Sequence, residues 1–180
     1  MKETLIINLI GGPCSGKSTI AAELFARLKK MGIHSELVSE YIKDRIYEEN
    51  QTMPKNQIAI FGMEHYNIST KLGKVDVIVH DGSFINNTSD LYNSEYNPEF
   101  DDLIVSEYHK FNNLDFFIKR GNIEFESYGR IHNLKQSKEL DKRIKETYDK
   151  YGLSYIEVES RDAVDKIIPI ILKKLSNDMQ

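Results

Sequence analysis

The residues with the clearest chemical meaning lie near the start of the chain. The run GGPCSGKS, from Gly11 to Ser18, matches the spacing G-x-x-x-x-G-K-[ST], which forms a phosphate-binding loop when a strand precedes it and a helix follows it. Gly11 and Gly16 permit the positive φ angles that ring a polyphosphate with backbone N–H donors. Lys17 can bring its ammonium group to the β- and γ-phosphates, and the Ser18 hydroxyl can ligate Mg²⁺. A nucleoside triphosphate is therefore predicted to contact Gly11, Gly12, Pro13, Cys14, Ser15, Gly16, Lys17, Ser18 and Thr19.

Two carboxylates follow apolar runs farther along the chain. Phosphoryl transfer spreads negative charge, so its site requires cations, a metal ion and an acid that orients or deprotonates the attacking hydroxyl. Glu40 follows one apolar run and Asp81 follows another. Because the carboxyl ends of parallel strands meet at one edge of an open sheet, both side chains are expected near Lys17. Asp81, which ends a buried strand, is predicted to hold Mg²⁺ together with Ser18.

Short apolar runs alternate with longer amphipathic segments, and these are the elements that must position the side chains. Runs typical of buried strands cover residues 4–10, 34–39, 75–80, 114–118 and 154–158. Apolar residues three or four apart predict helices over roughly 18–31, 41–49, 55–72, 98–111, 135–151 and 162–175. The alternation predicts an α/β fold, with a five-stranded, mostly parallel sheet flanked by helices on both faces. Residues 1–180 are expected to form one domain, and Pro169 is expected to kink the last helix or divide it.

The composition excludes several other classes of protein. The chain has 24 basic and 28 acidic residues and a formal net charge of −4, so nothing global attracts nucleic acid or an anionic membrane. Its apolar runs are too short to span a bilayer. The single cysteine, Cys14, rules out an internal disulfide framework, and the five histidines lack metal-like spacing. A reduced, cytoplasmic protein without a membrane segment is expected. An Asn-Lys-x-Asp stretch, with which a GTPase would read guanine, is absent from the sequence.

Taken together, the motifs resemble those of the P-loop kinase superfamily of nucleoside and nucleotide kinases. More narrowly, the chain is similar to phage-type nucleotide-kinase-like ATPases related to the ribosylnicotinamide kinase domain. The resemblance rests on GGPCSGKST, VSEYIKD, VDVIVHDGS and FFIKR…YGR, and it spans nearly all 180 residues. It implies a P-loop kinase fold with a mobile lid, which moves the γ-phosphate of Mg-ATP to a hydroxyl of a nucleoside or nucleotide.

The same resemblance implies roles for further residues. The lid would cover approximately 119–134, where Arg120 and Arg130 are expected to meet phosphate oxygens when the nucleotide binds. Glu40 matches the acid that accepts the hydroxyl proton in related deoxynucleoside kinases, although Asp44 and Asp81 remain alternatives for this base. The predicted catalytic residues are Lys17, Glu40, Asp81, Arg120 and Arg130.

Recognition of the acceptor is expected from the helix that follows Pro54. Asn56 and Gln57 begin this helix, and Phe61 and Tyr66 lie farther along it. A glutamine and an aromatic ring can read and stack a base, as side chains on the corresponding helix do in related nucleoside kinases. An ordinary polar residue on the outside of the helix would explain Gln57 equally well, and Phe61 is more typical of a core residue.

Two other functions remain compatible with the sequence. One is a kinase that acts on a modified base, of the 5-hydroxymethyluracil type, within DNA; the other is a regulatory ATPase that transfers no phosphate. Residues 119–150 carry nine basic and six acidic side chains, whereas residues 81–109 carry seven acidic side chains and no Lys or Arg. Because DNA binding needs several cations along one face, a free nucleoside or nucleotide is the favoured acceptor. The resemblance also leaves a homodimer open.

Overall fold

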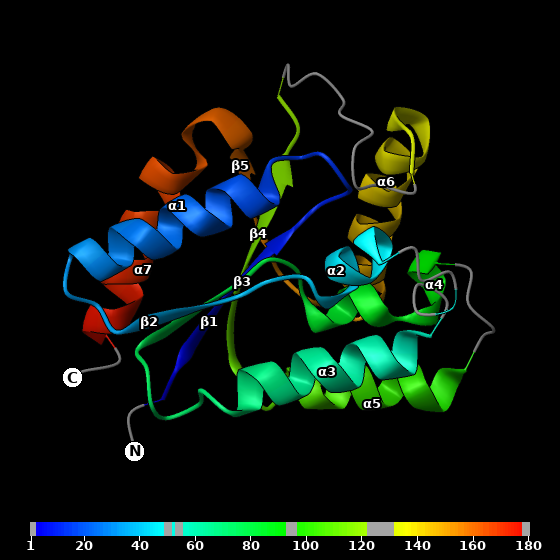
Figure 1. The fold of residues 1–180 in the computed structure, drawn as a ribbon, viewed down its shortest axis with the longest axis horizontal. Helices are drawn as coiled ribbons and strands as arrows, with labels where there is room; N and C mark the ends of the chain where they lie inside the picture. Colours follow the sequence, from blue (N-terminus) through cyan, green and yellow to red (C-terminus); the bar gives the residue numbers. More distant parts are fainter. Residues whose placement is uncertain (1–2, 49–51, 53–55, 93–96, 122–131, 178–180) are drawn as a thin grey trace.

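Strand β1 (Leu5–Ile10) runs through the centre of a five-stranded sheet (Figure 1). The structure is a computed structural model that describes residues 3–48, 52, 56–92, 97–121 and 132–177, without the side chains of Asp44, Asp90 and Tyr92. The strands pair in the order β2-β3-β1-β4-β5 and are all parallel. The other strands are β2 (Ser35–Val38), β3 (Val77–His80), β4 (Asn112–Lys119) and β5 (Ile156–Glu159). The helices are α1 (Lys17–Lys30), α2 (Tyr41–Tyr47), α3 (Gln57–Ser69), α4 (Ser89–Tyr92), α5 (Pro98–Tyr108), α6 (Leu134–Lys150) and α7 (Ala163–Asn177), with short 3₁₀ turns η2 (Phe84–Asn87) and η3 (Ser160–Asp162).

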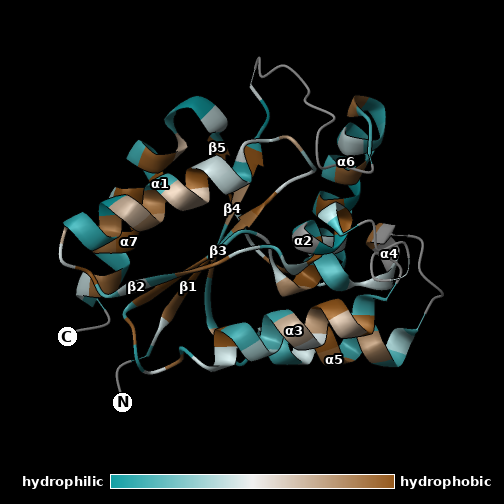
Figure 2. Cartoon of the chain, in the orientation of Figure 1, coloured by the Kyte–Doolittle hydropathy of each residue, from teal (hydrophilic) through white to brown (hydrophobic). Residues whose placement is uncertain are grey.

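Helices cover both faces of the sheet, which explains why β1 is buried along its whole length. Successive side chains of a strand point to opposite faces. Leu5, Ile7 and Leu9 therefore pack in one core with α1 and α7, whereas Ile6 and Ile10 pack in a second core with α3, α5 and α6. Figure 2 shows β1 largely in brown at the centre of the sheet, with helices that carry both teal and brown on either side. The α/β P-loop kinase fold expected from the sequence is confirmed.

Strand β4 begins at Asn112, two residues before the apolar run that predicted it. Asn112 and Asn113 pair in register with Leu5 and Ile6 of β1. The backbone hydrogen bonds of a strand do not require apolar side chains. The side-chain amide of Asn113 also forms a hydrogen bond, in which Nδ2 donates to the carbonyl oxygen of Tyr108 at 2.6 Å. A hydrophobic run therefore marks the buried centre of a strand but not its ends.

Helix α7 is continuous across Pro169. Proline removes one backbone hydrogen bond of a helix, but Ile167, Ile168 and Ile171 remain buried around it and hold both halves against the sheet. Of the two alternatives expected at Pro169, a kink or a division of the helix, the division is therefore wrong. In the part of the chain that the structure describes, no helix has the length and apolar character needed to cross a membrane.

Candidate active site

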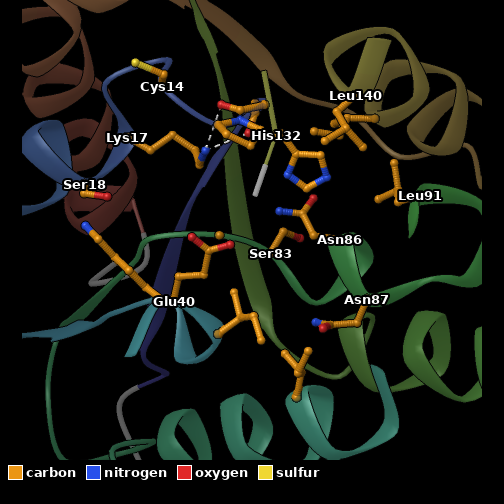
Figure 3. A pocket seen from close by; sticks show the side chains of 18 of the residues that line it. Cys14, Lys17, Ser18, Glu40, Ser83, Asn86, Asn87, Leu91, His132 and Leu140 are labelled. Carbon is orange, nitrogen blue, oxygen red and sulfur yellow. Dashed lines mark hydrogen bonds between the residues drawn. The ribbon is translucent and has the colours of Figure 1, made fainter. Parts of the chain in front are cut away.

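The phosphate-binding loop follows β1 directly and ends where α1 begins. Gly11 and Gly16 have φ angles of 141° and 95°, and Cys14 is left-handed as well, with a φ of 62°. A Cβ atom on Gly11 would lie 3.1 Å from the carbonyl oxygen of Ile118 on the neighbouring strand. Lys17 Nζ donates to the carbonyl oxygens of Gly11 at 2.7 Å and Gly12 at 3.1 Å (Figure 3). The loop thus has the local conformation that its spacing predicts.

A cavity of about 330 Å³ opens beside this loop. Its other walls come from α2, α3, η2 and α6 and from the residues that follow β2 and β3. Figure 3 shows Lys17 and Glu40 pointing into the same space, with Ser83, Asn86 and His132 grouped across from them. The volume is within the range of small-molecule sites, which starts at roughly 300 Å³. The loop is therefore one wall of a site that can hold a second molecule next to a phosphate chain.

Three carboxylates gather at this edge of the sheet, and two of them are the predicted pair. The Asp81 amide donates to the carbonyl oxygen of Val38 at 2.9 Å, so the ends of β2 and β3 are adjacent. Glu40 lines the cavity. Asp81 is only 4% exposed, and its Oδ1 is buried without a hydrogen-bond partner among the described residues. The third carboxylate is Glu64 of α3, which the sequence reasoning missed.

Glu64 is the most strongly perturbed acid of the cavity. Burial raises its pKa to about 8, although a hydrogen bond that it accepts from Asn87 acts in the opposite direction. Repulsion from Glu40 and from Asp81 raises the pKa further. Asn87 Nδ2 donates to Glu64 Oε2 at 2.8 Å, and both side chains are buried. Near neutral pH, Glu64 therefore carries a proton and can donate a hydrogen bond into the cavity.

The raised pKa of Glu64 predicts a measurable pH dependence of stability. The carboxyl group titrates near 4.5 when unperturbed and near 8 in the folded protein. The folded state binds this proton more tightly, so the contribution to the free energy of unfolding is complete below pH 4.5 and is lost as the pH rises through 8. The free energy of unfolding of the parent should therefore fall between pH 5 and pH 8.5 by roughly 3–5 kcal/mol more than that of the Glu64→Gln variant. Urea unfolding at several pH values measures this difference.

Glu139→Gln is a suitable control for that experiment. Glu139 lies on α6 with a side chain that is 56% exposed, so its substitution should leave the pH dependence as it is in the parent. If Glu64→Gln and the parent keep the same stability difference at every pH, Glu64 is ionised in the folded protein and the protonation argument fails.

The predicted magnesium ligands fit a hard cation. Mg²⁺ takes oxygen ligands and keeps several waters, so one or two protein oxygens suffice when phosphates supply the rest. Asp81 has an unpaired carboxylate oxygen, and the exposed Ser18 lines the cavity at the start of α1. Across the described residues, no group of three His, Cys, Asp or Glu side chains could hold a metal ion alone. This donor set suits a metal that arrives with a nucleotide.

Arg120 follows β4 directly and contacts the backbone of the phosphate-binding loop. Its side chain is 9% exposed and does not line the cavity. Arg120 Nη1 donates to the carbonyl oxygen of Pro13 at 2.6 Å, and Nη2 donates to Ser137 Oγ at 2.5 Å and to Asp141 Oδ2 at 3.0 Å. In this arrangement it supports the loop backbone, and its expected contact with phosphate stays a prediction. Arg130, and residues 122–131 of the predicted lid, lie outside the described residues.

The acceptor helix contributes differently from what was expected. Gln57 lines the cavity, whereas Phe61 packs in the core, 5.4 Å from Phe84 between ring centroids. Tyr66 is 63% exposed and lies away from the cavity wall. The signal for the missed Glu64 was present in the sequence, because a carboxylate there interrupts the buried face of α3.

The buried side chains beneath the cavity connect it to the sheet. The Tyr148 hydroxyl of α6 donates to Asp115 and is 3.0 Å from Ser83 Oγ, whose hydroxyl can donate to it. Asp115 also accepts from Asn8 Nδ2 at 2.7 Å. Tyr108 adds a third donor to Asp115 at 2.9 Å. Burial raises the pKa of Asp115 to about 6 in spite of these donors. The network fixes Ser83, and with it the turn that carries Asp81.

A second cavity, of about 280 Å³, also borders the loop. It shares Cys14, Gly16 and Thr19 with the first cavity, and its remaining walls come from α1, η3 and the start of α7. Asp162 of η3 has a buried Oδ1 without a hydrogen-bond partner among the described residues. The phosphate-binding loop is thus shared by two separate spaces.

Comparisons with known proteins agree with this architecture. The model of the AAA_28 family, described as an AAA domain, matches residues 6–166. A structure of deoxyadenosine kinase from M. mycoides, with the products dCMP and a flexible dCDP bound, aligns with a TM-score of 0.54 and 20% identity. The alignment covers 97% of this chain and 99% of that chain. A search of curated proteins gives no match. At 20% identity, this structural similarity shows a shared fold.

Proposed function

This chain belongs to the AAA_28 family of AAA domains, and from that premise we propose that it is a phosphotransferase. It would move the γ-phosphate of Mg-ATP to a hydroxyl group of a nucleoside or nucleotide. The observation that carries the proposal is the pair of cavities that share the phosphate-binding loop. A hydrolase or a switch needs room for one nucleotide, whereas a kinase must hold a donor and an acceptor with the transferred phosphate between them.

We assign the second cavity to the nucleoside part of ATP and the first to the acceptor. In the first cavity, Lys17 and Glu40 point into the same space from different elements. A transferred phosphoryl group would lie by Lys17, which can stabilise the charge that spreads over its oxygens. Glu40 would orient the acceptor hydroxyl and accept its proton as the new phosphate ester bond forms and the bond to the leaving ADP breaks.

Magnesium would be held by Asp81 and Ser18 together with nucleotide phosphates. When bound, it supplies positive charge to the β- and γ-phosphate oxygens. The protein's own contribution is to hold Asp81 at the end of β3, where its unpaired oxygen faces no competing donor among the described residues. The two acids would therefore have different roles: Asp81 would bind the metal ion and Glu40 would act as the base.

The inner part of the first cavity offers polar groups that suit a nucleobase. Asn86 has a buried Oδ1 without a partner among the described residues, so it can accept a hydrogen bond from an amino or imino group. Glu64, protonated near neutral pH, can donate one. Gln57 lines the same cavity and is 7% exposed. A ligand with both donors and acceptors on one planar edge fits these groups better than an aliphatic alcohol.

The role of Glu40 predicts a specific kinetic change. The Glu40→Gln variant keeps the shape of the side chain but cannot accept the hydroxyl proton, so kcat should fall by about 10²–10⁴-fold. KM for the acceptor should change much less, because the amide can still form a hydrogen bond to the hydroxyl. Steady-state kinetics in which the acceptor concentration is varied at saturating Mg-ATP measure both constants.

Glu36→Gln provides the matched control, because Glu36 lies on β2, the strand that precedes Glu40, with a side chain that is 44% exposed. It should behave like the parent. An unchanged kcat in Glu40→Gln would instead transfer the role of the base to Asp81 or to Asp44, whose side chain is outside the described residues.

The proposed function is tested by offering the protein many acceptors at once. Labelled Mg-ATP is incubated with nucleosides, nucleoside monophosphates, nicotinamide riboside and DNA that contains a hydroxymethylated base. Label in a nucleoside or monophosphate supports the proposal and names the acceptor. Label in nicotinamide riboside would support the narrower ribosylnicotinamide kinase resemblance. Label in DNA alone would replace the free acceptor by a DNA base, and ATP binding without label in any acceptor would indicate a regulatory ATPase.

A further inference from the structure

Helix α6 contacts the phosphate-binding loop through two side chains that lie one turn apart. Asp141 Oδ1 accepts the N–H of Gly12 at 2.6 Å, and Ser137 Oγ donates to the carbonyl oxygen of Pro13 at 2.5 Å. Arg120, just after β4, donates to the same Pro13 oxygen at 2.6 Å and to Asp141 Oδ2 at 3.0 Å. Ser137 is fully buried, and the Asp141 side chain is 22% exposed. We call Arg120, Ser137 and Asp141 the loop clamp.

The contact from Asp141 orients one particular peptide unit. All the described peptide bonds are trans, so the C=O and the N–H of one unit point in opposite directions. The N–H of Gly12 and the C=O of Gly11 belong to the same unit. While Asp141 accepts the N–H on one side, the Gly11 oxygen faces the other side, where it accepts from Lys17 Nζ at 2.7 Å.

The contacts to Pro13 orient a second unit in the same way. Arg120 and Ser137 both donate to the Pro13 oxygen, so the N–H of Cys14, which belongs to that peptide unit, points away from them. Cys14 borders both cavities. Its N–H therefore points to the side of the loop opposite the clamp.

We propose that Asp141 is a positioning residue for Lys17. Through the Gly11–Gly12 peptide it would hold the carbonyl oxygen that fixes the Lys17 ammonium, and so set the affinity of the loop for Mg-ATP. The inference rests on the proposed function only in taking Mg-ATP as the ligand of the loop. The proposal explains the loop clamp, whose three residues contact the loop backbone but do not line the first cavity.

Replacing Asp141 by asparagine separates this role from simple packing. A carboxylate has two oxygens and can accept from Gly12 and from Arg120 at once, as Asp141 does. Gly12 donates to Oδ1 and Arg120 donates to Oδ2. An asparagine has an oxygen at only one of these two positions and an NH₂ group, which cannot accept, at the other. The substitution keeps the size of the side chain, removes its negative charge, and removes one of the two hydrogen bonds to the Gly12 peptide and the Arg120 guanidinium.

A double-mutant cycle measures the proposed coupling. Calorimetry gives Kd for Mg-ATP in the parent, Asp141→Asn, Lys17→Ala and the doubly substituted protein. If Asp141 acts through Lys17, Asp141→Asn should weaken binding about tenfold in the parent, but by no more than about twofold once Lys17 is absent. Asp149→Asn makes the same chemical change at an exposed position of α6 and should leave Kd unchanged.

Two results would overturn the proposal: an equal loss of affinity in both backgrounds, or no loss in Asp141→Asn. If Asp141→Asn is too unstable to purify, Asp141→Glu goes through the same cycle, because it keeps the negative charge opposite Arg120 while displacing the oxygen that Gly12 needs. The cycle reads binding alone. A parent protein that binds Mg-ATP but phosphorylates no acceptor would refute the proposed function, and the cycle would still decide the role of Asp141.

Discussion

Lys17→Ala should lower the rate of phosphate transfer by at least about 10²–10³-fold, which corresponds to the ~3–4 kcal/mol that a charge-stabilising donor contributes to such a barrier. Lys17 lines the first cavity, and its ammonium group donates to two loop carbonyl oxygens, those of Gly11 and Gly12. Alanine removes both the positive charge and these two hydrogen bonds. Single-turnover measurements at saturating Mg-ATP report the loss in the chemical step separately from any loss in binding.

Lys30→Ala is the matched control for this experiment. Lys30 is exposed in the last turn of α1, the helix that Lys17 begins, and its substitution should leave the rate as it is in the parent. Urea unfolding of both variants shows whether each is as stably folded as the parent. A Lys17→Ala variant that folds and transfers phosphate within tenfold of the parent would remove Lys17 from the transfer step.

Gly12→Ala should have an effect of similar size for a purely steric reason. A Cβ atom on Gly12 would lie 2.4 Å from the carbonyl oxygen of Ser137, 2.8 Å from Ser137 Oγ and 2.9 Å from Asp141 Oδ1. The first of these atoms belongs to the backbone of α6, so the loop and the helix must move apart. A displacement of about 1 Å in such a site costs about a hundredfold in activity. We expect kcat/KM to fall at least that far, together with the affinity for Mg-ATP measured by calorimetry.

Gly62→Ala makes the same change where the structure has room for it. Gly62 lies within α3, and nothing is within 4 Å of the position that its Cβ would take. Because alanine is the better helix former, this variant should keep full activity and gain up to about 1 kcal/mol of stability. Unchanged binding of Mg-ATP by Gly12→Ala would mean that the loop functions without its close approach to α6.

The sequence was most informative where the determinants of structure are local. The turn, the left-handed glycines and the lysine of the phosphate-binding loop all lie between Gly11 and Ser18, so their spacing along the chain is their spacing in space. The buried strands could likewise be recognised, since continuous apolar runs are typical of parallel strands covered on both faces. The positions of Glu40 and Asp81 beside one another followed from the rule that parallel strands end at the same edge.

Contacts between distant segments could not be read in this way. The hydrogen bond from Gly12 to Asp141 joins residues 129 positions apart, and the one from Arg120 to Pro13 spans 107 positions. The sequence analysis placed Arg120 in a lid that meets phosphate. In the structure its guanidinium packs against the loop backbone, because α6 brings Ser137 and Asp141 to the end of β4.

The amino-acid sequence by itself determined the phosphate-binding loop, the α/β fold and the edge of the sheet at which two acids meet. Only the tertiary structure decided that Glu64 is buried beside them and carries a proton, and that α6 holds the loop in place. The physical reason is that backbone conformation and hydrophobic periodicity depend on neighbours within a few residues. The pKa of a carboxylate and the orientation of a peptide unit depend on whichever atoms the folded chain places around them.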